Sequence, residues 1–174
     1  MRLCKCTGGI VTKQRSCSVI TNICPSYQGI GKRGIGVGLP GGVNFAYDAA
    51  QMRLAMIWKG KFADPGGVWR GQGAGIVRPL GSDLQRFTAG SELVRLDRAG
   101  EIETEADAIR SPDHRFTGYY LDDLQRPTFT YRFGDIEVED RVIDIDVPDN
   151  DSDESAGGDT TLRRTVHFVS PRNE

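Results

Sequence analysis

The sequence predicts an all-β protein, an antiparallel sandwich or an open barrel of roughly seven to ten short strands. Short runs in which apolar residues alternate with polar or small ones recur along the chain, and turn-forming glycine, proline and aspartate separate them. Glycine supplies 22 of the 174 residues, nearly twice its usual share of ~7%. A hydrophobic content of 38% with 26% charged residues is typical of a soluble globular chain, so one domain with a sizeable core is expected.

The clearest strands lie between residues 34 and 59. Their apolar faces alternate as strand side chains do: Ile35, Val37 and Leu39, then Val43, Phe45 and Tyr47, then Met52, Leu54, Met56 and Trp58. Pro40-Gly-Gly forms the first turn, since proline presets φ and glycine accepts positive φ. Asp48-Ala-Ala-Gln forms the second turn. The glycine-rich stretch that follows Trp58 predicts a long loop.

The second half of the chain predicts a further hairpin and then a less regular strand. Residues 116–121 and 128–133 form the hairpin, with an aspartate-rich turn between them. Near Asp140 the apolar positions change from even to odd numbers, which predicts a turn or a bulge at that point. Residues 101–110 are the only plausible helix, and they are short.

Composition divides the chain into four segments. Residues 1–31 form a loosely ordered segment that holds all four cysteines, and residues 32–143 form the β-domain. Residues 144–160 are acidic and rich in glycine and serine, which predicts a disordered or mobile linker. Residues 161–174 begin one more strand that is cut short, so the sequence predicts a fragment of a longer gene product.

Charge and hydropathy exclude two classes of partner. Residues 1–100 carry fourteen Lys and Arg against five Asp and Glu, whereas residues 101–160 carry five against eighteen. The basic residues are scattered, and neither a helix nor an aromatic platform gathers them, so no nucleic-acid partner is predicted. No apolar run approaches the ~18 residues of a membrane span. The first residues also lack the apolar stretch of a signal peptide.

Two blocks of sequence carry a family resemblance. The first comprises Leu39-Pro-Gly-Gly, Phe45-Ala-Tyr-Asp, Leu54-Ala, Trp58-Lys-Gly, Phe62-Ala-Asp and Trp69-Arg-Gly-Gln-Gly. The second comprises Phe116-Thr-Gly-Tyr-Tyr-Leu-Asp, Arg126-Pro-Thr-Phe-Thr-Tyr and Val138-Glu-Asp. Together they resemble a β-rich module of large exported planctomycete-type proteins, which are labelled c-type cytochromes or pyrroloquinoline-quinone-type sugar dehydrogenases. The resemblance covers roughly residues 30–143, a span fit for one domain.

The resemblance implies an uncharacterised, non-catalytic accessory domain of an exported cytochrome- or dehydrogenase-like protein. Such a domain is expected to pack against redox domains of a larger protein or to touch carbohydrate, and to be periplasmic. The missing signal peptide is then explained if the true start of the gene lies upstream.

Sequence motifs for cofactors are absent or accidental. Covalent haem requires C-x-x-C-H, and the chain has none. The glycine pattern that starts at Gly36 matches G-x-G-x-x-G, but a dinucleotide site needs a helix after it, and here Pro40 and a β-type run follow. Asp149-Asn-Asp-Ser-Asp starts like a calcium loop, yet Glu154 replaces the glycine and Thr160 the glutamate that such a loop needs. We therefore expect no cofactor and no metal.

The best candidate binding patch comprises Trp58, Asp64, Trp69 and His114. Asp64 and Trp69 lie in the glycine-rich loop, and aromatic rings stack on the apolar faces of sugars. Each has an ordinary alternative: Trp58 continues an apolar row and so suits the core, while a surface position explains His114. No catalytic residue can be assigned.

Two other functions stay open. One is a carbohydrate-acting enzyme, a mutarotase- or hydrolase-like sandwich, for which Asp48, Asp64, Asp122 and Glu137 are the carboxylates that could serve as acid or base. Asp48 and Asp122 also stand where turns favour aspartate. The other is a metal-binding protein, using the cysteines of the first segment, although their spacing does not fit paired C-x2–4-C ligands. Those cysteines are Cys4, Cys6, Cys17 and Cys24.

Overall fold

The computed structural model of the protein describes residues 18–20, 26–27, 30, 33–64, 76–90, 92–93, 114–146 and 160–169. Within these ranges the chain forms twelve strands and no helix. The predicted all-β class is confirmed. The sheets keep free edges and do not close into a barrel.

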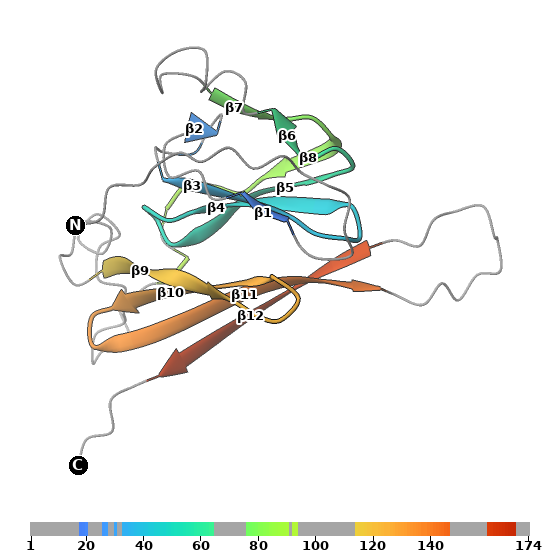
Figure 1. Cartoon of the computed structure of the whole chain (residues 1–174). Helices are drawn as coiled ribbons and strands as arrows, with labels where there is room; N and C mark the ends of the chain where they lie inside the picture. The colour runs from blue at the N-terminus through green and yellow to red at the C-terminus, as the bar shows by residue number, and fades with distance from the viewer. Residues whose placement is uncertain are drawn as a thin grey trace.

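Two sheets make up most of the molecule (Figure 1). The first is antiparallel and has the order β1-β3-β4-β5-β8. Its strands are β1 (Ser18–Ile20), β3 (Gly34–Gly38), β4 (Val43–Asp48), β5 (Arg53–Lys59) and β8 (Ser82–Arg86). The second is antiparallel and has the order β12-β11-β10-β9. Its strands are β9 (His114–Leu121), β10 (Pro127–Phe133), β11 (Ile136–Asp146) and β12 (Thr160–Val169).

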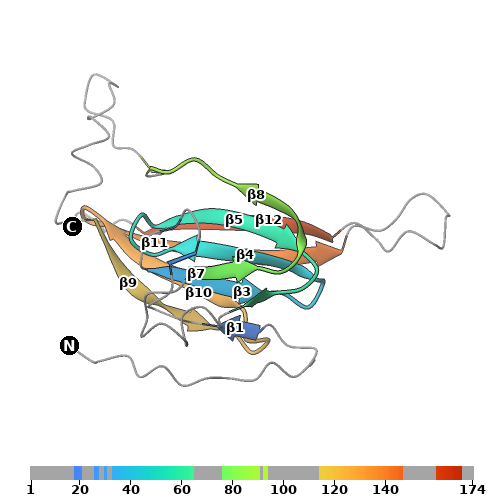
Figure 2. The same cartoon turned by 90° about the horizontal axis from the view of Figure 1, so that it is seen from above.

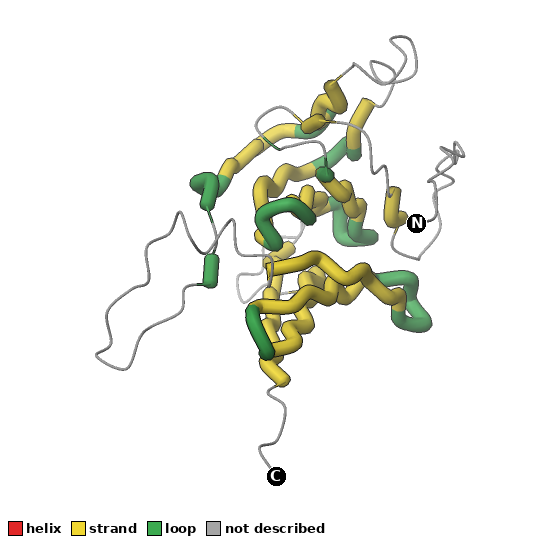
Figure 3. Tube along the Cα trace, turned by 90° about the vertical axis from the view of Figure 1, so that its left-hand side faces the viewer, coloured by secondary structure: helices red, strands yellow, loops and turns green. Residues whose placement is uncertain are grey.

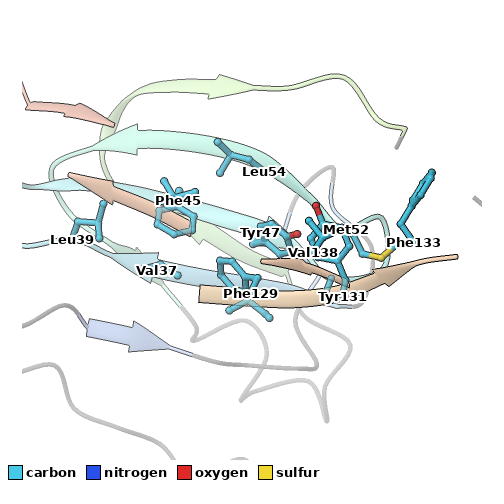
Figure 4. Close-up of a cluster of buried hydrophobic side chains, with 13 residues drawn as sticks. Val37, Leu39, Phe45, Tyr47, Met52, Leu54, Phe129, Tyr131, Phe133 and Val138 are labelled. Carbon is cyan, nitrogen blue, oxygen red and sulfur yellow. The ribbon is translucent and has the colours of Figure 1, made fainter. Parts of the chain in front are cut away.

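The two sheets pack face to face as a sandwich, and Figures 2 and 3 show the same two layers from above and from the side. Alternation places the odd-numbered apolar residues of β3 and β4 on the inner face, where they meet β10 and β11. The ring of Tyr47 stacks on that of Phe129 with centroids 4.0 Å apart, and Phe45 meets Phe129 edge-on at 6.3 Å. Figure 4 shows these rings in the middle of the core.

A third, smaller layer covers the other face of the first sheet. It consists of β2 (Ser26–Tyr27), β7 (Ile76–Pro79) and β6 (Ala63–Asp64), in which β2 runs parallel to β7. Trp58 and Met56 of β5 point to this side and form a second buried cluster with Val77 of β7. The first sheet is therefore buried on both faces, which explains the continuous burial of β3 and β4.

The prediction of a turn or bulge near Asp140 is wrong. β11 runs without interruption from Ile136 to Asp146 and keeps its register with both neighbours. The apolar phase changes because Asp140 occupies an inward position, in register with the inward Phe129 and Val166, while Ile143 takes an outward one. Register shifts occur instead opposite Thr130, in β9, and opposite Ala46, in β5.

Several of the predicted segments are only partly covered by the residues that the structure describes. β1 and β2 lie within the segment 1–31, and β11 continues to Asp146, three residues into the predicted acidic linker. β12 begins at Thr160. Residues 147–159 and the predicted helix at 101–110 lie outside the described residues.

Truncating Phe129 to alanine tests the shared interior. Its ring is fully buried between the sheets, so Phe129→Ala should lower the free energy of unfolding by about 3–5 kcal/mol, measured by denaturant titration. Leu124→Ala, at a residue 53% exposed in the β9–β10 turn, should change it by less than about 0.5 kcal/mol. Equal effects of the two substitutions would contradict the sandwich core described above.

Candidate functional site

An unusual feature of the structure is a charged cluster formed by the buried Asp140, the partly exposed Arg164 and the exposed Glu92. Asp140 lies on the inward face of β11 with no exposed side-chain surface. Arg164 lies on the inward face of β12, and Glu92 follows β8 of the opposite sheet. A buried carboxylate is costly unless a cation and hydrogen bonds satisfy it. The cluster is therefore expected to have close, directed contacts.

The contacts of Arg164 meet that requirement. Its Nε donates to Asp140 Oδ1 at 2.9 Å, and its Nη2 donates to Asp140 Oδ2 at 2.6 Å. This is the two-pronged geometry in which guanidinium and carboxylate match best. Its Nη1 forms an ion pair with Glu92. Burial lowers the pKa of Arg164, but the hydrogen bonds to Asp140 and the charges of Asp140 and Glu92 outweigh burial and raise the pKa.

Two tyrosine rings enclose the same carboxylate. Burial, followed by the negative charge of Asp140, raises the pKa of Tyr47 well above its ordinary value of 10.0. The same two causes, in the same order, raise the pKa of Tyr131. Both phenols therefore stay neutral at physiological pH, and the cluster comprises one ion pair, a second carboxylate and two neutral hydroxyls.

A second inward carboxylate joins the two sheets further along β11. Asp144 Oδ2 accepts a hydrogen bond of 2.9 Å from the backbone N–H of Gly41, in the turn between β3 and β4. Asp140 and Asp144 thus interrupt the apolar pattern of β11 at positions where each binds a group outside its own strand. The Asp144 bond joins the two sheets, whereas Asp140 binds Arg164 on the neighbouring strand of its own sheet.

Asp48 and Arg53 form another buried pair, on the outer face of the first sheet. Their charged atoms lie 3.8 Å apart, and both side chains are almost fully buried. Asp48 Oδ1 accepts hydrogen bonds from the N–H groups of Ala50 and Gln51 at 2.9 and 3.3 Å. Arg53 donates to the side chain of Gln51 and to the backbone oxygen of Phe87. Asp48 thus makes the local turn bonds typical of aspartate at such a site.

Asp122 closes the hairpin between β9 and β10. Its Oδ1 accepts hydrogen bonds from the N–H groups of Leu124 and Arg126, at 3.0 and 2.9 Å. Its Oδ2 accepts from the guanidinium groups of Arg126 and Arg141, at 2.8 and 2.5 Å. Desolvation raises the pKa of Asp122, but these hydrogen bonds and the charge of Arg126 outweigh it, so the pKa lies below the ordinary 3.8.

The residues of the predicted binding patch are not brought together among those described. Trp58 is 1% exposed, and its indole Nε1 donates to the backbone oxygen of Phe62 at 2.6 Å. Asp64 is exposed at the end of β6, in the third layer. His114 begins β9 in the other sheet, where its ring stacks on Phe133 at 3.8 Å. The five-stranded sheet separates Trp58 from His114, and Trp69 lies outside the described residues.

The outer face of the second sheet carries polar contacts that sequence patterns did not single out. The Tyr120 hydroxyl donates to Glu139 Oε1 at 3.2 Å, and His167 Nδ1 lies 3.6 Å from Glu139 Oε2. Arg115 and Arg132 stand directly opposite each other on the same face. The alternation of polar residues along β10 was the available signal, but cross-strand register cannot be obtained from one strand alone.

The described part of the chain contains neither a metal-binding cluster nor a membrane-spanning helix. No three His, Cys, Asp or Glu side chains gather there into a metal site, and all four cysteines lie outside it. The same residues include no helix with the length and hydropathy of a membrane span. No family model matches the sequence, and no match was found among curated proteins or solved structures.

Substitutions in the interior pair should separate charge pairing from packing. Asp140→Val leaves Arg164 without its buried partner and should lower the free energy of unfolding by about 3–5 kcal/mol. The double substitution Asp140→Val with Arg164→Met removes both charges and should restore most of that loss. Denaturant unfolding of the wild type, both single variants and the double variant measures the coupling. A double variant as unstable as the sum of the single variants would contradict pairing.

Asp122 should make stability depend on acid pH. Its folded pKa is lowered, so its contribution to the free energy of unfolding is present above pH 3.8 and is lost as pH falls through the folded value. The difference between wild type and Asp122→Asn should therefore be largest near neutral pH and shrink in acid. Unfolding curves at a series of pH values check this. Asp123→Asn, at the exposed neighbouring residue, is the matched control and should show no such trend.

Proposed function

We propose that this chain is a non-catalytic β-sandwich module, an accessory domain of an exported cytochrome- or dehydrogenase-like protein. The main support for the proposal is that the buried carboxylates of the interior pair with arginine side chains. Asp140 and Asp48 bind arginine side chains, and both carboxylates are buried; the side chain of Arg53 is buried as well, whereas that of Arg164 is 25% exposed. An acid or base that acts on substrate needs a reactive atom within reach of that substrate. The two buried carboxylates instead pair with arginines that stabilise the fold.

The predicted site residues support the same proposal. Trp58 fills the space between the first sheet and the third layer, and His114 is stacked on Phe133. The exposed carboxylates weighed for acid–base work lie on different layers: Asp64 on the third layer and Glu137 on the outer face of the second sheet. Glycoside chemistry needs two carboxyl groups about 5–9.5 Å apart. This placement favours a module over an enzyme that uses these two residues.

The genomic sequence on either side of the coding region tests the accessory role. A module of this kind should share its reading frame with an export signal and with C-x-x-C-H segments, which attach haem covalently. Flanking stop codons, with neither feature in the same frame, would contradict the proposal.

An activity measurement separates the module from the enzyme. The purified chain should not accelerate the anomerisation of glucose, followed by polarimetry, or the hydrolysis of aryl glycosides, followed by absorbance. Asp64→Asn and His114→Ala should behave like the wild type in both assays. A rate above buffer that Asp64→Asn abolishes would favour the carbohydrate-acting enzyme instead.

A further inference from the structure

β12 forms one margin of the second sheet, and no described strand pairs with its outer edge. The strand is 10 residues long and keeps an unbroken register with β11 over its whole length. Figure 1 shows it, in red, as the outermost strand of the lower sheet. An edge of this kind presents a row of backbone N–H and C=O groups that another extended chain can bind.

The other sheet margins are shorter or irregular. β9 carries the register shift opposite Thr130, and its Gly118 has a φ of 152°. β8 has five residues, among them Asp83 with a φ of 54°, a left-handed conformation that bends the strand. β1 has three residues. Bulges and short edges are two of the devices that prevent strand pairing, and β12 has neither.

The charge on β12 indicates which chain would pair with it. Arg163 is exposed on the outer face, and none of the described carboxylates forms an ion pair with it. Its direct neighbour on β11 is Ile143, and the next residues on that face are Arg141 and Ile145. β12 itself contains no acidic residue. A second copy of β12 would bring further arginines to this edge, whereas an acidic strand would complement it.

We infer that the outer edge of β12 is a docking site for an acidic extended peptide segment of a partner protein, which adds to the second sheet as a fifth strand. The inference rests on the proposed function and deepens it, since it names the edge and the chemistry through which the accessory module binds. Backbone hydrogen bonds supply the attachment, and alternate side chains supply the selectivity.

Two side chains of β12 define the pattern of the incoming strand. Arg163 lies on the outer face, where a carboxylate on the partner strand opposite it would pair with its charge. Phe168 lies on the inner face, 52% exposed, and an apolar side chain opposite it would cover its ring. Because the two positions differ by an odd number, the acid and the apolar residue fall on opposite faces of the partner strand. A strand that alternates acidic and apolar residues fits both.

A peptide of about ten residues that alternates glutamate and valine is the probe, and its lysine–valine counterpart is the control. The full chain should bind the glutamate peptide, with NMR shift changes confined to β12 and its neighbours, and should not bind the lysine peptide. Arg163→Glu should weaken binding of the glutamate peptide about threefold to tenfold. The same variant should gain affinity for the lysine peptide.

Arg132→Glu is the matched variant, because it makes the same charge change on the same sheet but on the central strand β10. It should leave glutamate-peptide binding unchanged, and both variants should unfold cooperatively like the wild type. Binding that is equally weakened by Arg132→Glu, shift changes away from β12, or dimerisation of the free chain in sedimentation experiments would overturn the inference. Those outcomes leave the proposed accessory role intact, since the flanking gene sequence tests that role separately.

Discussion

The pairing of Asp140 with Arg164 is the constraint on which the architecture depends. A carboxylate with no exposed surface lies among aromatic rings, and burial of such a charge without a partner is strongly unfavourable. β12 supplies that partner, because Arg164 lies at the inward position opposite Val142. The ion pair therefore fixes the register of β11 and β12, because a slip of one residue would turn Arg164 outward and leave Asp140 uncompensated.

The ion pair also relates the two sheets to each other. Arg164 contacts Glu92, which follows the last strand of the first sheet, and Asp144 binds the amide of Gly41 in the first hairpin. Apolar packing between Tyr47 and Phe129 supplies most of the buried area, but such contacts tolerate small displacements. Directed polar contacts at separate points along β11 are what define a single alignment of the layers.

The sequence predicted the class of fold and much of the core, because alternation and turn residues are local signals. The inward rows of β3, β4 and β10 lie where their periodicity places them. The same reasoning gave a wrong prediction at Asp140. A charged residue in the apolar row was read as a turn or bulge, because the sequence around Asp140 does not show that Arg164 pairs with it. The separation of Trp58 from His114 was equally beyond prediction, because it depends on which face of which sheet each strand presents.

Arg164 follows Asp140 by 24 residues and Glu92 by 72. On a ribosome, β11 is therefore complete before the cation that neutralises its carboxylate has been synthesised. Until β12 emerges, closing the sheets over Asp140 would bury its charge without a partner, which is unfavourable. Burial of Asp140 therefore becomes favourable only once β12, the last of the described strands, is in place.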